Sequence, residues 1–226
     1  MGALALGLAA TGLVASQAEG AMLPLLAVAM GLGAAFVLLE YGFTAGFRDF
    51  LVAGDGRALG AAFVVPAIAA LVVVPVGALA EGYGRFVAPI GLPLVGGAAM
   101  FGVGMQIANG CGSGTLVAAG QGARRMLLAL PFFCLGGVLG SLMLPAALRL
   151  PGLGVVDLAE RFGPWGGLLA TELLLGGAAV LVLRGAWPGR RRLLAGAVVG
   201  VLAAALFLVS GEPWGITLGL TLWGAK

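Results

Sequence analysis

The feature that most constrains the fold is a series of apolar segments, each long enough to cross a bilayer as a helix. A transmembrane helix needs about 20 mainly apolar residues. Such windows lie near residues 1–18, 21–41, 58–80, 87–109, 125–147, 165–184 and 193–210, and another apolar stretch covers Trp214–Ala225. Only 9% of the 226 residues are charged, too few to cover a soluble domain. The sequence therefore predicts an all-α membrane protein, a polytopic helical bundle of about seven or eight transmembrane segments in a single domain, 1–226.

The N-terminal segment fits a membrane span better than a signal peptide. Met1–Ala18 is apolar, and no Lys or Arg precedes Arg48. A secretory signal normally begins with basic residues. We therefore predict a first membrane segment here, with a short cleaved signal as the alternative.

Composition also excludes several function classes. The net charge of +3 comes from arginines that lie singly or in short clusters between apolar segments, where topology signals belong; nucleic acid is therefore not an expected partner. Histidine, the commonest metal ligand, is absent, and Cys111 and Cys134 fit no metal-binding spacing. We expect no metal and no cofactor, and no phosphate-binding loop is present to support ATP-driven transport.

Two segments behave neither as ordinary spans nor as ordinary loops. Phe43–Ala53 is too polar to cross lipid, and Cys111–Gly120 is too short. Each follows an apolar helix, ends in a Gly-x-Gly turn and is followed closely by arginine. We interpret them as broken or re-entrant half-helices of an internal repeat, with units at about 21–57 and 87–125, a construction frequent in transporters. The alternative is chance similarity between Gly/Ala/Leu-rich segments.

Arginine placement indicates an orientation. The loops after the second, fourth and sixth windows hold Arg48, Arg57, Arg124, Arg125, Arg184, Arg190, Arg191 and Arg192, and the alternate loops hold only Arg85, Arg149 and Arg161. The positive-inside rule makes the first set cytoplasmic. A re-entrant half-helix would change this parity.

The densest polar signal runs from Asn109 to Thr115. Its glycines, Gly110, Gly112 and Gly114, leave backbone N–H groups accessible around Cys111, and a helix starting near Ser113 would aim its positive end at the thiol. Cys111 adds a weak S–H donor and a polarizable sulfur. This pattern predicts an anion site that binds weakly enough to release its ligand. The alternative is that Cys111 is a small buried apolar residue, which is the interpretation we prefer for Cys134.

Other polar residues in apolar surroundings are weaker candidates. A membrane carboxylate such as Glu172 indicates function by default, although a neutral, hydrogen-bonded role between helices is an equal alternative. Arg48 and Asp49 are expected to form a structural ion pair with each other.

Three stretches, in matching order, resemble the YeeE/YedE family of sulfur-compound transporters. Gly42–Phe50 resembles the first signature of that family and Asn109–Gly114 the second. Pro213–Thr217, followed by Leu222–Lys226, is similar to a later stretch. The resemblance covers nearly the whole chain.

The resemblance implies thiosulfate uptake through an hourglass-like helical protein with pseudo-symmetric halves, in which cysteines pass the anion by transient hydrogen bonds. It implies that Cys111 is the central relay cysteine. At the position where the first signature usually has cysteine, this chain has Thr44, whose hydroxyl can donate a hydrogen bond but cannot do redox chemistry. The family also has a later cysteine motif that this chain does not reach before Lys226.

The leading functional hypothesis is therefore a permease, not an enzyme, for thiosulfate or a related small sulfur anion in the bacterial inner membrane. Its substrate-binding residues would be Cys111, Thr44, Asn109, Gly110, Gly112, Ser113 and Gly114. One alternative is a membrane subunit that hands sulfur to a cytosolic sulfurtransferase through a Cys111 persulfide. Others are one half of a split or truncated transporter, partnered by a second membrane half, and a non-transporting remnant.

Overall fold

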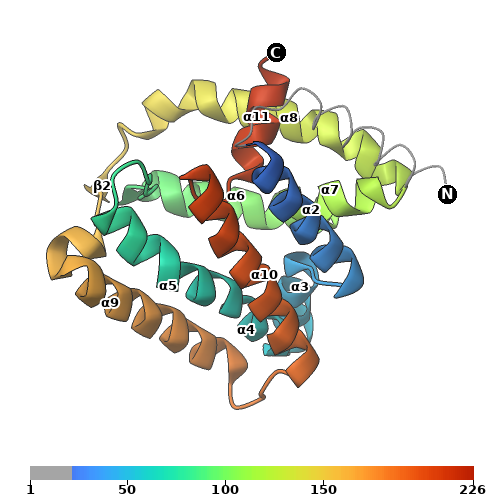
Figure 1. Cartoon of the computed structure of the whole chain (residues 1–226). Coiled ribbons are helices and arrows are strands. Elements are labelled where there is room, and N and C mark those ends of the chain that lie inside the picture. The colour runs from blue at the N-terminus through green and yellow to red at the C-terminus, as the bar shows by residue number, and fades with distance from the viewer. Residues whose placement is uncertain (1–21) are drawn as a thin grey trace.

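The computed structural model describes residues 22–226, so the predicted first segment Met1–Ala18 lies outside the described residues. The described chain is almost entirely helical (Figure 1). Its elements are α2 Met22–Leu38, α3 Phe43–Ala53, α4 Arg57–Ala62, α5 Val64–Leu79, β1 Ile90–Gly91, α6 Leu92–Ala108, α7 Gly112–Gly120, α8 Arg124–Ala147, β2 Gly152–Gly154, α9 Leu158–Leu183, α10 Arg190–Ser210 and α11 Ile216–Gly224.

Six helical stretches among residues 22–226 are long and apolar enough to cross a membrane. They are Met22–Ala53, Arg57–Leu79, Leu92–Gly120, Arg124–Ala147, Leu158–Leu183 and Arg190–Ser210. The first contains α2 and α3, and the third contains α6 and α7. The prediction of an all-α polytopic membrane protein is confirmed. The stretch Trp214–Ala225 forms only the nine-residue α11, too short to span a bilayer by itself.

Helix α10 is the centre of a tightly packed group that also includes α2, α4, α5 and α9. Small residues face its neighbours, so the helix backbones approach closely, as is common in membrane bundles. A Cβ at Gly196 would lie 3.0 Å from the Ala61 carbonyl oxygen, and one at Gly200 would lie 2.9 Å from Ile68 Cβ. Phe207 and Val199 are fully buried here. This group forms the core of the described chain.

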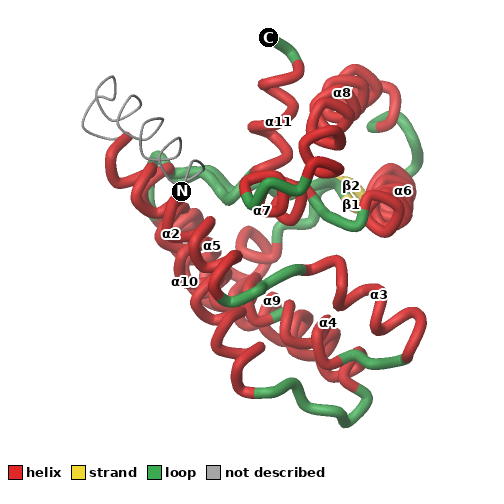
Figure 2. Tube along the Cα trace, turned by 90° about the vertical axis from the view of Figure 1, so that its right-hand side faces the viewer, coloured by secondary structure: helices red, strands yellow, loops and turns green. Residues whose placement is uncertain are grey.

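Helices α6, α7, α8 and α11 form a second group, which Figure 2 shows apart from the first. In it α8 packs against α7 and α11. Gly224 of α11 lies so close to α8 that a Cβ there would be 2.7 Å from the carbonyl oxygen of Cys134. Only Met126 is buried along the 24 residues of α8, whereas seven residues of α10 are buried. The second group therefore leaves much more apolar surface uncovered than the first.

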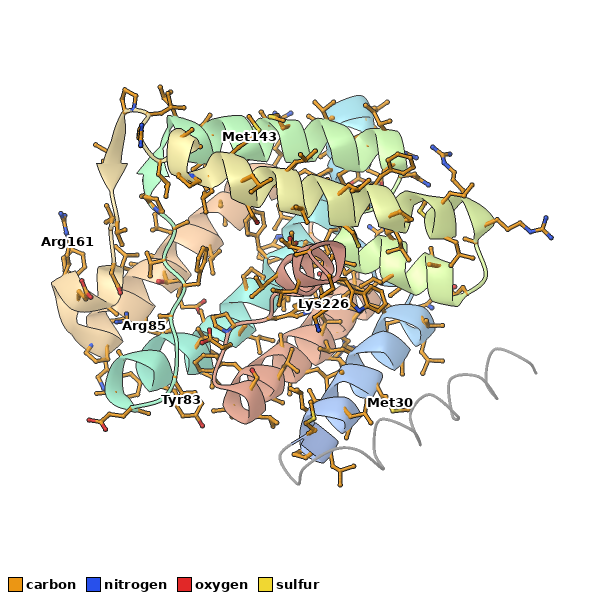
Figure 3. All side chains as sticks on the ribbon, turned by 90° about the horizontal axis from the view of Figure 1, so that it is seen from above. Met30, Tyr83, Arg85, Met143, Arg161 and Lys226 are labelled. Carbon is orange, nitrogen blue, oxygen red and sulfur yellow. The ribbon has the colours of Figure 1, made fainter. Side chains whose placement is uncertain are left out.

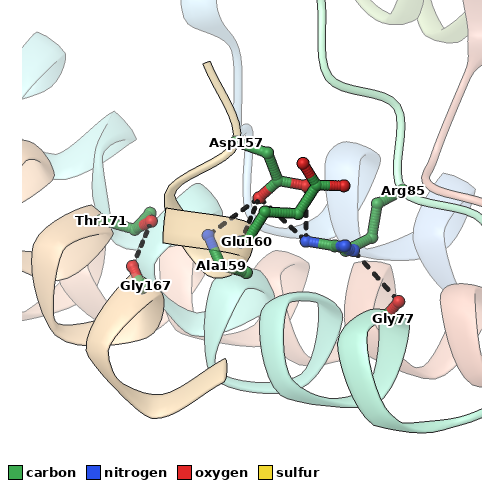
Figure 4. Close-up of polar contacts among 7 residues, drawn as sticks. All are labelled: Gly77, Arg85, Asp157, Ala159, Glu160, Gly167 and Thr171. Atoms are coloured by element: carbon green, nitrogen blue, oxygen red, sulfur yellow. Dashed lines mark hydrogen bonds and ion pairs between the residues drawn. The ribbon is translucent and has the colours of Figure 1, made fainter. Parts of the chain in front are cut away.

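The end of the bundle opposite α3 and α4 is held by a small sheet and an ion pair. Strands β1 and β2 pair antiparallel. Arg85, in the loop after α5, bonds the Gly77 carbonyl oxygen at 3.0 Å and forms an ion pair of 2.7 Å with Asp157, which also caps the N-terminus of α9 (Figure 4). Figure 3 shows Arg161 on the same side of the molecule as Arg85. Helix α9 itself is kinked at Gly163, where φ is +76°, directly before Pro164.

Candidate functional site

The second helix break places Cys111 at the start of a half-helix. Helix α6 ends at Ala108, Asn109 takes a left-handed conformation with φ 58°, and Cys111 is the N-cap residue of α7. The sequence predicted a helix start near Ser113, and the structure starts the helix at Gly112. The first backbone N–H groups of a helix have no partner within it. The thiol and these donors therefore lie at the same point.

Around Cys111 the break is compact. Its side chain is buried, and Sγ lies 3.1 Å from Ser113 Oγ. Thr115 is completely buried, and its hydroxyl finds no hydrogen-bond partner among residues 22–226. A Cβ at Gly110 would lie 2.9 Å from Thr115 Oγ1. Gly110 is therefore required because the chain passes directly over the first turn of α7.

The first helix break also places a buried polar side chain at the start of a half-helix. Gly42 is the extended N-cap residue of α3, and Thr44 is the second residue of the half-helix and is buried. Gly46, one turn further, lets α3 approach α4, because a Cβ there would lie 3.0 Å from the Leu59 backbone nitrogen. After each half-helix comes a glycine with positive φ, Gly54 or Gly122, and the next helix begins with arginine.

Two hydrogen bonds join the breaks. Gln106 Nε2 donates to the Thr44 carbonyl oxygen at 3.3 Å, and Arg48 Nη2 donates to Asn109 Oδ1 at 2.7 Å. The expected ion pair between Arg48 and Asp49 is wrong. Successive residues of a helix point in different directions, and Arg48 turns instead toward the second break. The two motifs, more than 60 residues apart in sequence, are thus parts of one site.

A cavity of about 360 Å³, which we call the central cavity, lies between the two half-helix starts. Six of the seven predicted binding residues line it: Thr44, Asn109, Gly110, Cys111, Ser113 and Gly114. The seventh, Gly112, lines a neighbouring cavity. The structure therefore brings all seven into one region.

The neighbouring cavity, here the aromatic cavity, has a volume of about 320 Å³ and is lined largely by Phe43, Phe47, Phe101 and Trp214. Cys111, Ser113 and Phe43 line both cavities. The thiol therefore lies at the boundary between the central cavity and the more apolar aromatic cavity.

Sequence reasoning missed Tyr41 as a site residue. Its ring contacts Phe36 and Phe43, and it lines the central cavity. Its hydroxyl is buried without a hydrogen-bond partner in the described part of the chain. The signal that could have identified it is the aromatic cluster around the first break, Tyr41 with Phe43 and Phe47.

Cys134 and Glu172, two further candidates from the sequence, lie away from these two cavities. Cys134 is half-buried in α8 against α11, and both cysteines are free thiols. Glu172, on α9, has a carboxylate oxygen without a hydrogen-bond partner among residues 22–226, and it lines neither cavity. Within that range no three His, Cys, Asp or Glu side chains gather as metal ligands would.

Comparison with known proteins gives the family. The sulphur transport family matches residues 40–192, which include both half-helices and everything between them. Among curated proteins, the chain is similar to "Probable transporter YedE" of Escherichia coli and of Salmonella typhimurium, with 31% identity over 170 residues in each case. The match covers 71% of this chain and 41% of the relatives, so it spans less than half of their length. No solved structure matches. The chain belongs to the sulphur transport family.

Proposed function

We propose that the chain forms the pathway of a permease for thiosulfate or a related small sulfur anion in the bacterial inner membrane, with Cys111 as the central relay. The observation that carries this proposal is the position of Cys111, at the start of α7 and at the boundary of two cavities. A residue so placed would contact any solute that moves from one cavity to the other.

The chemistry of the boundary suits an anion that loses its water. The first N–H groups of α7 supply partial positive charge without a fixed cation. The Cys111 thiol and the Ser113 hydroxyl, 3.1 Å apart, add two donors that can exchange partners. Each is a neutral donor, so the anion is held by several modest hydrogen bonds and not by an ion pair. Such binding supports passage because the anion must also leave.

Thr44 supports a second step in the same cavity. It occupies the position at which the resemblance expects a cysteine, and it is the second residue of α3, whereas Cys111 is the N-cap residue of α7. Its hydroxyl can donate a hydrogen bond to the anion. We interpret the units at about 21–57 and 87–125 as a repeat that supplies one relay residue from each break.

The chain spans less than half the length of the curated relatives it matches. The matched relatives are more than twice as long as the region they share with it. We therefore include a second membrane half among the partners of the proposed permease. Transfer of sulfur to a cytosolic sulfurtransferase is less well supported, because a persulfide needs a reactive thiolate and the group bonded to Cys111 is a neutral hydroxyl.

Uptake of labelled thiosulfate by cells that lack their own uptake systems tests this proposal. Cells with the chain, co-expressed with a second half if needed, should accumulate label, and the Cys111→Ala variant should accumulate much less. Equal uptake by the two at equal membrane amounts would reject Cys111 as the relay.

A further inference from the structure

A third cavity, here the arginine cavity, opens beside the central cavity. It has a volume of about 320 Å³ and lies between the end of α2, α3, α4 and the start of α10. Its charged lining residues are Glu40, Asp49, Arg191 and Arg192. Four residues, from Glu40 to Gly42 and Ala45, line both this cavity and the central one. The two spaces therefore adjoin along the segment that connects α2 to α3.

The charge at this end of the bundle favours anions. The basic residues here are Arg48 within α3 and, at helix ends and turns, Arg57, Arg124, Arg125, Arg184, Arg190, Arg191 and Arg192. Among residues 22–226 the carboxylates at this end are Glu40, Asp49 and Asp55. The opposite end, near β1 and β2, holds both Arg85, Arg149 and Arg161 and the carboxylates Glu81, Asp157, Glu160 and Glu212. A mouth lined by an excess of one sign concentrates ions of the other sign.

The carboxylates within the cavity do not cancel this effect. Glu40 lies 3.7 Å from Arg191, and both side chains are at least three-quarters exposed. An exposed pair at that separation is weak, so an arriving anion can replace Glu40. Among residues 22–226, no carboxylate lies within ion-pairing distance of Arg192. Asp49 opposes an anion, but it is outnumbered at this end.

Tyr41 lies at the junction of the two cavities. It lines both, and its buried hydroxyl has no partner among the described residues. A buried hydroxyl without a partner is costly, and a passing anion would satisfy it. The hydroxyl therefore fits an intermediate donor between the arginines and the two half-helix starts.

We propose that the arginine cavity is an anion vestibule, through which the small sulfur anion passes between the arginine-rich end and Cys111. Arg191 and Arg192 attract the anion, and the Tyr41 hydroxyl donates a hydrogen bond to it as it enters the central cavity. This inference rests on the proposed function for the identity of the anion. The same arginines would suit a lipid headgroup, which shares the chemistry of a small oxyanion, so the tests separate the two.

The first test does not depend on transport. In the Cys134→Ala chain, Cys111 is the single thiol. Membrane vesicles that expose the arginine-rich end are treated with two methanethiosulfonate reagents, one bearing a sulfonate and one a trimethylammonium group. Compared with a free thiol in solution, Cys111 should react faster with the anionic reagent than with the cationic one. The double variant Arg191→Gln, Arg192→Gln should reduce this preference about tenfold. Arg190→Gln is the matched control, since Arg190 is on the same turn but outside the cavity. An unchanged preference, an equal fall in Arg190→Gln or an unreactive Cys111 would overturn the vestibule.

The second test uses flux of thiosulfate into liposomes. The double arginine variant should require about tenfold more thiosulfate for half-maximal flux from the arginine-rich end, with the maximal rate nearly unchanged, and Tyr41→Phe should lower the maximal rate. These effects should be the same in phosphatidylcholine and in liposomes containing phosphatidylglycerol. A defect seen only with the anionic lipid would assign the arginines to headgroups. If Cys111 shows the charge preference but thiosulfate does not cross, the vestibule stands and thiosulfate is rejected as the substrate. If thiosulfate crosses at a rate that the arginine substitutions do not change, the proposed substrate stands and the vestibule is rejected.

Discussion

The two helix breaks share one arrangement of helices but differ in how closely the chain is packed around each of them. At both, a 17-residue helix ends and a short half-helix begins next to a buried side chain with one weak donor. At the α2–α3 break a Cβ on Gly42 would meet nothing within 4 Å, whereas at the α6–α7 break a Cβ on Gly110 would collide with Thr115. The α6–α7 break is thus tightly packed, and its Cys111 lines both the central and the aromatic cavity, whereas Thr44 lines only the central one. Shared architecture therefore does not make the two breaks equally sensitive to change.

The largest expected effect comes from Gly110→Ala. The added Cβ forces Thr115 and the first turn of α7 to shift, which we expect to cost about 1–3 kcal/mol of stability and to remove most uptake. Gly42→Ala, in open space, should behave like the unmodified chain. Gly112→Ala is a control within the same break, because its Cβ would meet Ile216 and Leu220 at ordinary distances of 3.7 and 3.9 Å. Thermal unfolding in detergent and uptake per folded protein measure both quantities. Similar losses of stability and uptake in Gly42→Ala and Gly110→Ala would contradict the difference in packing between the two breaks.

The next effect concerns the two residues that we propose as relays, Cys111 and Thr44. Cys111→Ala removes a donor from the boundary between the cavities, and leaving its partner unsatisfied costs on the order of 1–3 kcal/mol, about a tenfold loss of uptake or more. Thr44→Ala should lose less, since Thr44 lines only the central cavity. Cys111→Ser should be intermediate, because a hydroxyl keeps a donor with a different reach.

Cys134→Ala is the matched control for these variants. It removes the other thiol from α8, where it contacts only packing neighbours, and uptake should be nearly unchanged. An effect at Cys134 larger than that at Cys111 would favour a purely structural role for the thiols.

Thr44→Cys tests how alike the breaks are. It restores the residue that the resemblance expects, at a buried position beside the central cavity. We expect uptake to be preserved or raised up to a few-fold, because a thiol binds an anion more weakly than a hydroxyl and releases it sooner. Initial rates at saturating thiosulfate measure this step. A loss comparable to that of Thr44→Ala would show that the hydroxyl has its own function.

The smallest effect lies in the turns after the half-helices. Asp55 pairs with Arg57 at 2.8 Å, and hydrogen bonds from Arg57 hold the pKa of this carboxyl down at about 2. A lowered pKa means that the pair stabilises the fold fully above the unfolded pKa, near 4, and loses this contribution as the pH falls through about 2. The pair is exposed, so Asp55→Asn should change the unfolding temperature very little at pH 7. A clear loss of stability at neutral pH would contradict this. The corresponding turn at Gln121 has no carboxylate.

Much of the fold and part of the site could be predicted from the sequence. Membrane spans follow from length and apolarity, and the α6–α7 break follows from Asn109 and the glycines around Cys111, because local chemistry determines both. The partner of Arg48 could not be predicted, since Asn109 reaches it only when two distant motifs meet. The same holds for Tyr41, which looks like an interfacial aromatic until the cavities on both of its sides are known.

Glycine contacts along α10 also indicate where this molecule can move. Gly196 and Gly200 bring the α10 backbone against α4 and α5 at near-contact distances, so neither sliding nor rotation of α10 is compatible with the packing. The close glycine contacts of α8, at Gly137 and at Gly224 of α11, join it to α11 and not to the first group, and its only buried residue is Met126 near its start. The first group can thus serve as a fixed frame, against which α6, α7, α8 and α11 tilt as a lever. Any rocking motion that widens the space beside Cys111 would pivot at the β1–β2 pair and at the ion pair between Arg85 and Asp157.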